Sequence, residues 1–360
     1  SVFKVFSLSS FLNLGGITPE TRFYCSGENC YTHKTKRGVI KIRCTGTHKD
    51  IDTGDIIKYS CNTACYASDT VSEKDFYDMI LKFGFGQETG VELPEETSVS
   101  VKNSVKNYEK WSARSKPSMA IGQELNVTAM QIVQAATAIA NHGMMLAPRV
   151  IKKVSDATGK TILETEKKEV RQVVSPEVAD DMLLMMERAS NGGTARRHGV
   201  QGVRLSTKTG TAQVYDTKLK KYSDTKFTAS CLCIFPTENP QYIIYNATFS
   251  PTGSITTGAG ISVPAIGKIA NNIVAYKGIP REGDTMVTFD ENVRTNAVEK
   301  DYTVFDTIPD FTGASKKHLL PLFKDGRFNL SIKGSGWVYS QNPAPGTPVT
   351  SGMTLEFELR

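Results

Sequence analysis

Between residues 204 and 250 the sequence changes from a helical to a strand-like pattern, and this change constrains the fold more than any other feature. Three β-rich segments follow one another there, joined by polar turns: RLSTKTGTAQVY, KFTASCLCIFP and QYIIYNATFS. Short polar connections between such runs are typical of antiparallel neighbours. The sequence therefore predicts an antiparallel three-stranded meander.

Helices with clear start signals flank this meander. One is predicted over residues 127–142, where Thr128 and Gln131 form a capping box. Another begins at Ser175-Pro176, with serine at the N-cap and proline at the first helical position. A last helix over residues 262–276 is expected to pack on the sheet. Helices beside an antiparallel sheet indicate an α+β fold.

Two further elements are predicted toward the N-terminal side of the meander. Residues 1–14 read as an amphipathic helix that ends at Gly15-Gly16 in the manner of a C-terminal cap. Residues 149–166 read as a β-hairpin whose turn lies near residues 156–159.

A loss of periodicity late in the chain predicts its division into domains. Residues 1–276 form a large domain, 277–307 a polar linker, and 308–360 a small domain with strands of its own. The 360 residues suffice for this arrangement. The net charge of +6 is mild and suits an anionic polymer or a location facing a membrane. Because the basic residues form no stripe, no nucleic-acid partner is expected.

Seven cysteines are numerous for a chain of this size. Cys25, Cys30 and Cys44 lie in a Gly-, Asn- and Lys-rich stretch where a disulfide would staple a loop. A zinc site is the competing hypothesis and would take His33 or His48 as a fourth ligand. Because the spacing matches no zinc finger or ribbon, we predict no metal.

The remaining cysteines fall into two spaced pairs. Cys61 and Cys65 are four apart on a predicted helix, and Cys231 and Cys233 are two apart on a predicted strand. Each spacing places both side chains on one face. All four are therefore interpreted as small buried apolar residues.

The opening letters SVFK leave two interpretations for Ser1. Serine is a favoured helix N-cap. Alternatively, Ser1 is a nucleophile whose base, Lys4, lies one helical turn away, where hydroxyl and amine can form a hydrogen bond. The pair alone decides little, because Ser223 and Lys226 repeat it in the predicted polar turn KKYSDTKF, where nothing suggests catalysis.

Two further motifs distinguish Ser1 from that second serine. Ser60-Cys61-Asn62 supplies a Ser-x-Asn, although Ser340 to Asn342 repeats this pattern in the small domain. Lys208-Thr209-Gly210 occurs once, on the first strand of the meander. The three motifs in this order form the signature of penicillin-binding proteins and class A β-lactamases.

The resemblance extends along most of the chain. SVFKVFSL, YSCNTA, FGFGQETGVELPEE, IGQELNVTAMQIVQAATAIANHG, GGTARRHGVQGVRLSTKTGTAQ and IFPTENPQYII are similar, in order, to segments of the transpeptidase domain of class B penicillin-binding proteins. IPDFTGASKKHLLPLF with IKGSGWVYSQNPAPGTPVTSGMTLEFEL resembles a PASTA unit. The resemblance implies a penicillin-binding-protein and serine β-lactamase-like α+β fold, with an antiparallel sheet packed between helices, followed by a small α+β PASTA domain.

The resemblance also assigns catalytic roles. Ser1 is the nucleophile and Lys4 its base, and a serine hydroxyl needs such a neighbouring neutral amine. Lys208 is the second cation that, together with burial, pushes Lys4 toward neutrality. Ser60 passes a proton to the leaving nitrogen, and Asn62 holds Lys4 and the substrate amide in register.

The substrate-binding roles fall on the strand that carries Lys208. Thr209 and Thr211 receive the terminal carboxylate together with that lysine, and Gly210 leaves room for the substrate to lie against the strand edge. The backbone N–H groups of Ser1 and Thr211 form the oxyanion hole. His48 lies where the family often has Gly-His-Gly, but the second glycine is absent, so we interpret it as a surface histidine.

The implied function is peptidoglycan D,D-transpeptidation without a cofactor. The substrates are stem peptides ending in D-Ala-D-Ala, and β-lactam antibiotics acylate the same serine. A membrane glycan polymerase and divisome proteins are the implied partners, in septal wall synthesis. The implied location is the bacterial cytoplasmic membrane, with the catalytic domain outside the cytoplasm. The resemblance further implies that the membrane anchor, the first strands and the first helix of the domain lie upstream of this sequence.

The same motifs are compatible with three alternatives to transpeptidation. A class A β-lactamase is disfavoured, because the two Leu-Asn pairs carry Ser9 and Gly122 where its deacylating glutamate belongs. A D,D-carboxypeptidase differs only in using water as acceptor, and a non-catalytic penicillin-binding sensor would be acylated without turnover. The PASTA unit either braces the catalytic domain, which we favour, or binds ligand through the alternating Trp337, Tyr339 and Gln341.

Overall fold

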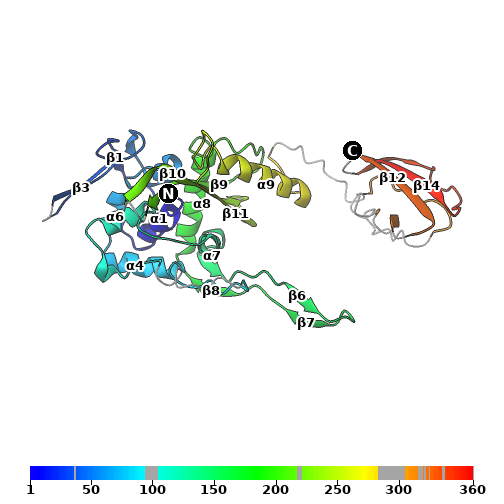
Figure 1. Ribbon diagram of the computed structural model, residues 1–360, viewed down its shortest axis with the longest axis horizontal. Helices are drawn as coiled ribbons and strands as arrows, with labels where there is room; N and C mark the ends of the chain where they lie inside the picture. Colours follow the sequence, from blue (N-terminus) through cyan, green and yellow to red (C-terminus); the bar gives the residue numbers. More distant parts are fainter. Residues whose placement is uncertain are drawn as a thin grey trace. The chain divides into compact units, whose positions relative to one another are not determined.

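The computed structural model divides into two compact units, Ser1–Asp284 and Thr285–Arg360. It describes residues 1–35, 38–93, 104–216, 221–282, 305–314, 319, 322–323, 325–334 and 337–359, and Figure 1 traces them. Most of the predicted linker, residues 283–304, lies outside the described residues. Of the helices in the described part, none combines the length and the hydropathy needed to cross a bilayer.

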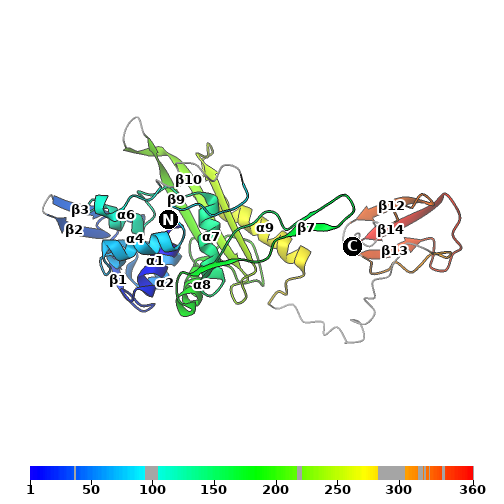
Figure 2. The ribbon, with the colours of Figure 1, turned by 90° about the horizontal axis from the view of Figure 1, so that it is seen from below.

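The centre of the first unit is the predicted antiparallel meander. It consists of β9 (Ser206–Asp216), β10 (Lys221–Phe235) and β11 (Tyr242–Phe249), in the order β11-β10-β9, and Figure 2 shows the three long strands side by side. β10 is longer than predicted, because the segment expected as a polar turn belongs to it. Ser223 lies there beside a register shift and accepts hydrogen bonds from the backbone N–H groups of Thr225 and Lys226.

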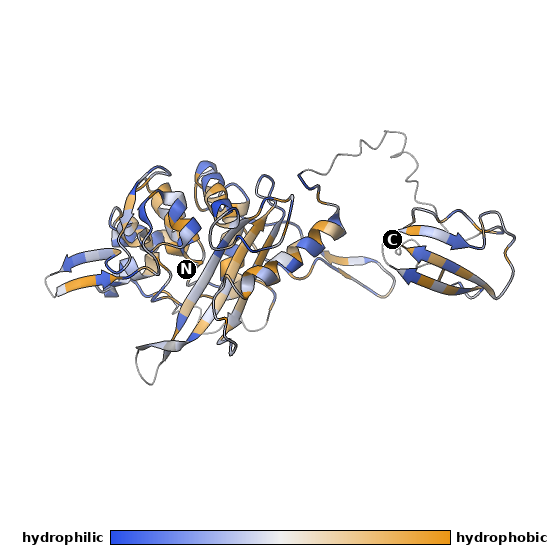
Figure 3. Cartoon of the chain, turned by 90° about the horizontal axis from the view of Figure 1, so that it is seen from above, coloured by the Kyte–Doolittle hydropathy of each residue, from blue (hydrophilic) through white to orange (hydrophobic). Residues whose placement is uncertain are grey.

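Helices cover both faces of this sheet. α9 (Ser262–Lys277) packs on one face, where Cys231 and Cys233 are buried, which confirms the prediction for that pair. α7 (Ala129–Ala140) and α8 (Pro176–Ser190) contact the sheet from the face that carries the alternate residues of β10. In Figure 3 the hydrophobic colouring gathers along these strands and helices.

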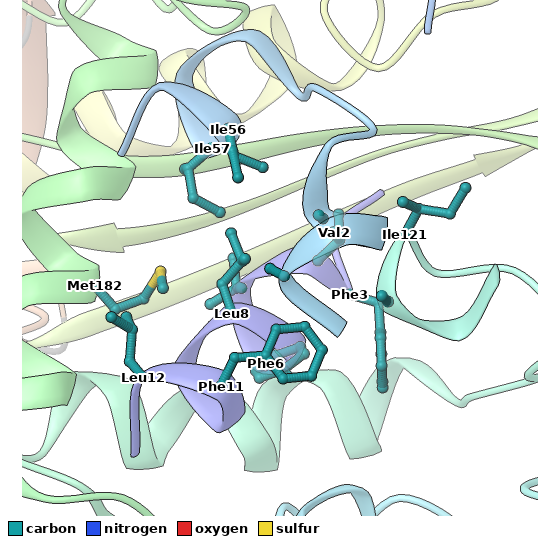
Figure 4. Close-up of a cluster of buried hydrophobic side chains, with 14 of the residues drawn as sticks. Val2, Phe3, Phe6, Leu8, Phe11, Leu12, Ile56, Ile57, Ile121 and Met182 are labelled. Atoms are coloured by element: carbon teal, nitrogen blue, oxygen red, sulfur yellow. The ribbon is translucent and has the colours of Figure 1, made fainter. Parts of the chain in front are cut away.

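The first helix, α1 (Lys4–Asn13), differs from its prediction in one respect. It ends as expected, with Gly15 at φ +69° and the N–H of Gly16 bonded to the carbonyl of Phe11. However, it is buried on all sides rather than amphipathic. The helices that contact it are α2 (Thr53–Tyr59), α3 (Ala64–Ser68), α4 (Glu73–Lys82), α6 (Ser115–Ala120) and α8. Figure 4 shows side chains of α1 beside Ile56, Ile57 and Met182.

Two of the three buried serines of α1 have hydrogen-bond partners inside the protein, whereas Ser9 Oγ has none. Ser7 Oγ donates to the carbonyl of Ala120 across 2.7 Å, and Ser10 Oγ donates to the carbonyl of Phe6 across 2.8 Å. A serine that bonds a nearby carbonyl leaves no unsatisfied polar group behind. Hydrogen bonds therefore offset the cost of burying the hydroxyl groups of Ser7 and Ser10, but not that of Ser9.

The predicted start signals of α7 and α8 are confirmed. Thr128 and Gln131 form the capping box, with bonds of 3.0 and 3.1 Å. Ser175 accepts from the N–H of Val178 at 3.3 Å, and Pro176 occupies the first turn. Both signals depend on residues within four positions of one another, so local sequence suffices to predict them.

Short two-stranded sheets surround the central one. The predicted hairpin is confirmed as β6 (Lys153–Ser155) paired with β7 (Thr161–Glu164). The other pairs are β1 (Phe23–Cys25) with β4 (Lys49–Ile51), β2 (Tyr31–Thr35) with β3 (Gly38–Ile42), and β5 (Met144–Leu146) with β8 (Glu169–Gln172); the 3₁₀ helix η1 covers Tyr108–Lys110. The β1–β4 and β2–β3 pairs precede α2 in the chain.

The second unit contains a three-stranded mixed sheet. β12 (Phe328–Gly334) is parallel to β14 (Met353–Leu359), which is antiparallel to β13 (Val338–Asn342). Phe311, Phe357 and the residues around them form its own core. Trp337 and Tyr339 are 59% and 55% exposed, so these aromatic side chains are not part of that core.

Candidate active site

Ser1 does not cap the first helix. The N-cap position of α1 is Phe3, and no side chain caps that end. Ser1 precedes it in a tight turn that is closed by the N–H of Lys4 on the Ser1 carbonyl, at 3.1 Å. This turn brings Lys4 Nζ within 3.2 Å of Ser1 Oγ, where the amine donates to the hydroxyl. Of the two interpretations left open by the sequence, the geometry supports the one in which Ser1 is a nucleophile and Lys4 is its base.

Both lysines of the predicted site are completely buried. Burial lowers the pKa of Lys4 from 10.5 to about 8. Burial, and then the charge of Lys4, lowers the pKa of Lys208 well below its ordinary value. Both ammonium forms are therefore destabilised, and a negatively charged ligand in the cleft would favour a proton on Lys208.

Ser60 joins the site from the turn between α2 and α3. Its hydroxyl accepts a hydrogen bond of 2.8 Å from Lys208 Nζ, which also donates to the carbonyl of Thr209 at 2.6 Å. Ser60 has φ +57° and ψ +35°, in the left-handed region, where the N–H of Cys61 bonds the carbonyl of Ile56. A non-glycine residue in this region is strained, and such strain concentrates at functional sites.

Asn62 lies at the same turn but does not contact Lys4 as expected. Its side-chain amide donates to the carbonyl of Arg43 across 2.7 Å, which ties the turn to the segment after β3. Asn62 also lines the cleft beside Ser1 and Ser60. Asn62 therefore lines the cleft, and its side chain binds the carbonyl of Arg43 instead of the predicted partner, Lys4.

The Lys-Thr-Gly motif forms part of β9. Thr209 Oγ1 donates to Thr194 Oγ1 at 2.8 Å, and Thr211 Oγ1 accepts from the N–H of Gly258 at 3.2 Å. Both threonines line the cleft. Because side chains alternate along a strand, Lys208 and Gly210 face the protein interior instead.

Gly210 is required for packing against the nucleophile segment. A Cβ at this position would lie 2.5 Å from Ser230 Oγ and 3.1 Å from Val2 Cγ2. The first distance is far below ordinary contact and the second is tight, so a side chain here would force Ser230 and Val2, the residue that follows Ser1, to shift. The structure therefore explains this glycine by packing against Ser230 and Val2, which the sequence did not reveal, and its predicted role in leaving room for substrate stays a prediction.

A cleft of about 840 Å³ connects the predicted groups. Ser1, Ser60, Asn62, Thr209 and Thr211 line it, and the two buried lysines contact Ser1 and Ser60 from beneath. Among the other lining residues the charged ones are Lys41, Arg43, Arg114 and Glu28. The excess of positive charge suits a carboxylate-bearing ligand.

Some lining residues were missed by sequence reasoning. Gly122 and Gln123 lie in the IGQELN segment, and Thr194 lies in GGTARR. Gly122 has φ +84°, and a Cβ there would lie 3.1 Å from the Ser1 backbone nitrogen. Both segments belong to the stretches that resemble the family, and this resemblance is the only feature of the sequence that could have pointed to these residues.

Beside the cleft lies a group of cysteines that the sequence analysis had assigned to separate sets. The ligand atoms of Cys25, Cys44, His48 and Cys61 all lie within 4.8 Å of one another. All seven cysteines are free thiols, so the expected disulfide is not formed. His33 is exposed on β2 and is not part of the group.

Two predictions about these residues were wrong. His48 is not a surface histidine: it is half-buried and stacks on Tyr59, with ring centroids 5.2 Å apart. Cys61 does not share a helix face with Cys65, because it lies in the turn before α3, whereas Cys65 lies within α3 and donates to Pro117. Tertiary contacts between segments distant in sequence decide both positions.

Comparisons with known proteins identify the family. Residues 1–275 match the family described as the penicillin binding protein transpeptidase domain, and residues 306–360 match the PASTA domain. Stage V sporulation protein D of Bacillus subtilis is 27% identical over 368 residues, covering 100% of this chain and 53% of that protein. PbpB of Mycolicibacterium smegmatis is 31% identical over 222 residues, covering 59% of this chain and 34% of that protein. The chain thus spans about half, or less, of the length of these curated relatives.

A solved structure supports the fold as well. Penicillin binding protein 3 from Mycobacterium tuberculosis, complexed with ampicillin, matches with a TM-score of 0.69 at 26% identity, covering 79% of this chain and 63% of that one. The family match covers most of the chain, and the three motifs meet at one cleft in a sheet packed between helices. This chain therefore belongs to the penicillin-binding protein transpeptidase family and carries a PASTA domain at its C-terminal end.

Proposed function

We propose that this chain catalyses serine-type peptidoglycan D,D-transpeptidation. The observation that carries the proposal is the pairing of Ser1 with a buried amine. Ser1 Oγ lies 3.2 Å from Lys4 Nζ, and burial lowers the pKa of Lys4 to about 8. An amine with this pKa is neutral in a useful fraction of molecules near neutral pH, as a general base must be.

In the first step Ser1 attacks the carbonyl carbon between the two terminal D-alanines. The Oγ–C bond forms while Lys4 takes the hydroxyl proton, and the developing oxyanion is held by the backbone N–H groups of Ser1 and Thr211. The C–N bond then breaks, and the proton that Lys4 accepted passes through Ser60, which Lys208 contacts at 2.8 Å, to the leaving D-alanine nitrogen, so that Lys4 is neutral again. The product is a Ser1 ester of the shortened stem peptide.

In the second step an amine from a neighbouring strand attacks this ester. Its nitrogen forms the new amide bond while Lys4 takes the excess proton from it, the Ser1 Oγ–C bond breaks, and Lys4 returns that proton to Ser1 Oγ. Water in place of the amine would give a D,D-carboxypeptidase. If neither an amine nor water attacked the ester, the acyl-enzyme would be stable and the protein would act as a sensor.

Substrate binding is assigned to the motif on β9 and the basic lining of the cleft. Thr209, Gly210 and Thr211, with Lys208, would receive the terminal carboxylate, whose charge offsets the buried cation. A β-lactam would acylate Ser1 in the same orientation. The ampicillin complex of the Mycobacterium tuberculosis relative supports this part of the proposal.

The cellular setting is also proposed. We assign residues 1–276 to catalysis, 277–307 to a linker and 308–360 to a PASTA domain. The protein would be anchored in the bacterial cytoplasmic membrane with its catalytic domain outside the cytoplasm. A membrane glycan polymerase and divisome proteins would be its partners in septal wall synthesis, as the resemblance to PASTA-bearing family members implies.

Two assays test the proposed chemistry. Incubation with penicillin, followed by peptide mass spectrometry, should place the adduct on Ser1. Ser1→Ala should abolish labelling, whereas Ser223→Ala, the matched change in the second Ser-x-x-Lys pair, should leave it intact. An adduct on another residue would contradict the assignment.

The second assay follows a stem-peptide thioester with and without an added amine acceptor. An aminolysis product is the expected result. Rapid hydrolysis alone would indicate a carboxypeptidase, and a stable acyl-enzyme without product would indicate a sensor.

A further inference from the structure

The cysteine-histidine group is assembled from three separate segments. Cys25 ends β1, Cys44 follows β3, His48 precedes β4, and Cys61 lies in the turn between α2 and α3. Cys25 and Cys61 are fully buried, and Cys44 and His48 are half-buried. Three thiols and an imidazole converging in this way are the donor set of a closed zinc site.

Two of the distances between donor atoms match the edges of a tetrahedron around an ion. With Zn–S near 2.3 Å and Zn–N near 2.0 Å, the sulfur–sulfur edge of a tetrahedron is about 3.8 Å and the sulfur–nitrogen edge about 3.5 Å. The Sγ atoms of Cys44 and Cys61 are 3.8 Å apart, and Cys44 Sγ is 3.6 Å from His48 Nδ1. A disulfide would need sulfur atoms about 2.05 Å apart. The spacing therefore matches an ion held between the groups better than a bond joining them.

Surrounding contacts orient the donors. Cys25 Sγ lies 3.5 Å from the carbonyl of Gly46, and Thr63 Oγ1 donates to Cys61 Sγ at 3.4 Å. The His48 ring is stacked on Tyr59 with an interplanar angle of 10°. Contacts of this kind around the ligands fix their orientation in metal sites.

Cys30 adds a fifth donor beside the group. Its Sγ is 3.5 Å from that of Cys25. Because the group whose donor atoms all lie within 4.8 Å of one another consists of Cys25, Cys44, His48 and Cys61, Cys30 is assigned to the surroundings of the ion rather than to its ligands.

We propose that Cys25, Cys44, Cys61 and His48 bind one zinc ion that has a structural role. All four positions of the ion would be filled by protein, so the ion would not take part in acyl transfer. Binding would release the protons of the three thiols to solvent as they become thiolates. The ion would join β1, the segment between β3 and β4, and the turn after α2.

The position of the site gives it a consequence for catalysis, and this part rests on the proposed function. Cys61 is the middle residue of the Ser60-Cys61-Asn62 motif, and Cys44 follows Arg43, whose carbonyl accepts from Asn62 at 2.7 Å. The ion would therefore hold both ends of that contact. It would also hold the strained turn that directs Ser60 toward Lys208.

Metal binding is tested first, without reference to activity. Protein purified without chelator should contain about one zinc ion per chain. Replacement of zinc by cobalt(II) should give the intense visible bands and thiolate charge-transfer absorption of a tetrahedral sulfur-ligated ion. Cys44→Ser and His48→Ala should reduce zinc content and alter the cobalt spectrum. Cys233→Ala, which removes a buried thiol outside the group, should change neither.

The outcomes are decisive even if a variant folds poorly, because the cobalt spectrum is recorded on the unaltered protein. Absence of zinc together with a cobalt spectrum lacking sulfur ligation would overturn the proposal. So would peptide mapping that finds a Cys44–Cys61 disulfide in the isolated protein.

The link to catalysis is tested separately. Removal of zinc with a chelator should slow penicillin acylation of Ser1 at least tenfold, and added zinc should restore it. Bound zinc with no effect of its removal on acylation would refute the link to the Ser60 turn while leaving the metal site standing. If the zinc-bound protein is not acylated at all, the proposed function fails instead.

Discussion

The pH dependence of Ser1 acylation follows from the burial of Lys4. Burial lowers the pKa of Lys4 from 10.5 to about 8, so about one-tenth of the molecules carry a neutral amine at pH 7, compared with about three in ten thousand for an ordinary lysine. Burial thus raises the population of the active base about 300-fold. Because the neutral form is the base, the rate should rise with pH through the pKa.

The expected profile is therefore a sigmoid with its midpoint near pH 8. The second-order rate constant for acylation by a fluorescent penicillin should increase about tenfold between pH 7 and pH 9, then level off. Circular dichroism at each pH would verify that the fold is retained. Burial lowers the pKa of Lys4, and the titratable groups that act against this effect are Cys65, Cys44, Cys61 and Cys30.

A matched variant isolates the contribution of Lys4. Lys4→Arg keeps a cation that stays protonated over the whole range, so acylation should be lost at every pH. A rate that is constant from pH 6 to pH 9, or that falls as pH rises, would refute the assignment of Lys4 as the base. Rapid acylation of the arginine variant would refute it equally.

Two further predictions concern stability. Lys4 keeps its proton up to its ordinary pKa of 10.5 in the unfolded chain, but only up to a pKa of about 8 in the folded chain. The free energy of unfolding therefore rises with pH between these two values. At pH 7 the burial of Lys4 lowers the free energy of unfolding by about 3 kcal/mol. Lys4→Met should raise the free energy of unfolding in urea by up to that amount while abolishing acylation, and a decrease would contradict the argument. Gly210→Ala should destabilise by about 1–3 kcal/mol and slow acylation, because its Cβ would lie 2.5 Å from Ser230 Oγ. Gly253→Ala, with no atom near the added carbon, is the control; equal effects of the two changes would contradict the packing argument.

Local signals predicted most of the secondary structure correctly. The capping box of Thr128 and Gln131, the Ser175-Pro176 start and the glycines after α1 act between residues a few positions apart, and each lies where the sequence predicted it. The alternation along β10 likewise predicted that Cys231 and Cys233 share a buried face. Local geometry fixes these features, so tertiary context rarely changes them.

Predictions failed where distant segments decide the environment. The burial of α1 on all sides depends on five other helices, and the donation of Ser7 to Ala120 joins residues 113 positions apart. The extension of β10 through Ser223 depends on its pairing with β9. Periodicity carries no information about a partner on the opposite side of a helix or strand.

The sequence by itself determined the order of the elements, the family and the residue types of the three motifs. The tertiary structure decided which of two Ser-x-x-Lys pairs has a buried amine, because desolvation of Lys4 depends on its complete enclosure by other segments. It also decided that Cys25, Cys44, His48 and Cys61 form one group, since their spacing along the chain fits no metal motif and only the folding of β1, β3, β4 and α2 brings their donor atoms within 4.8 Å. Burial and convergence are properties of the packed chain, and no short stretch of sequence contains them.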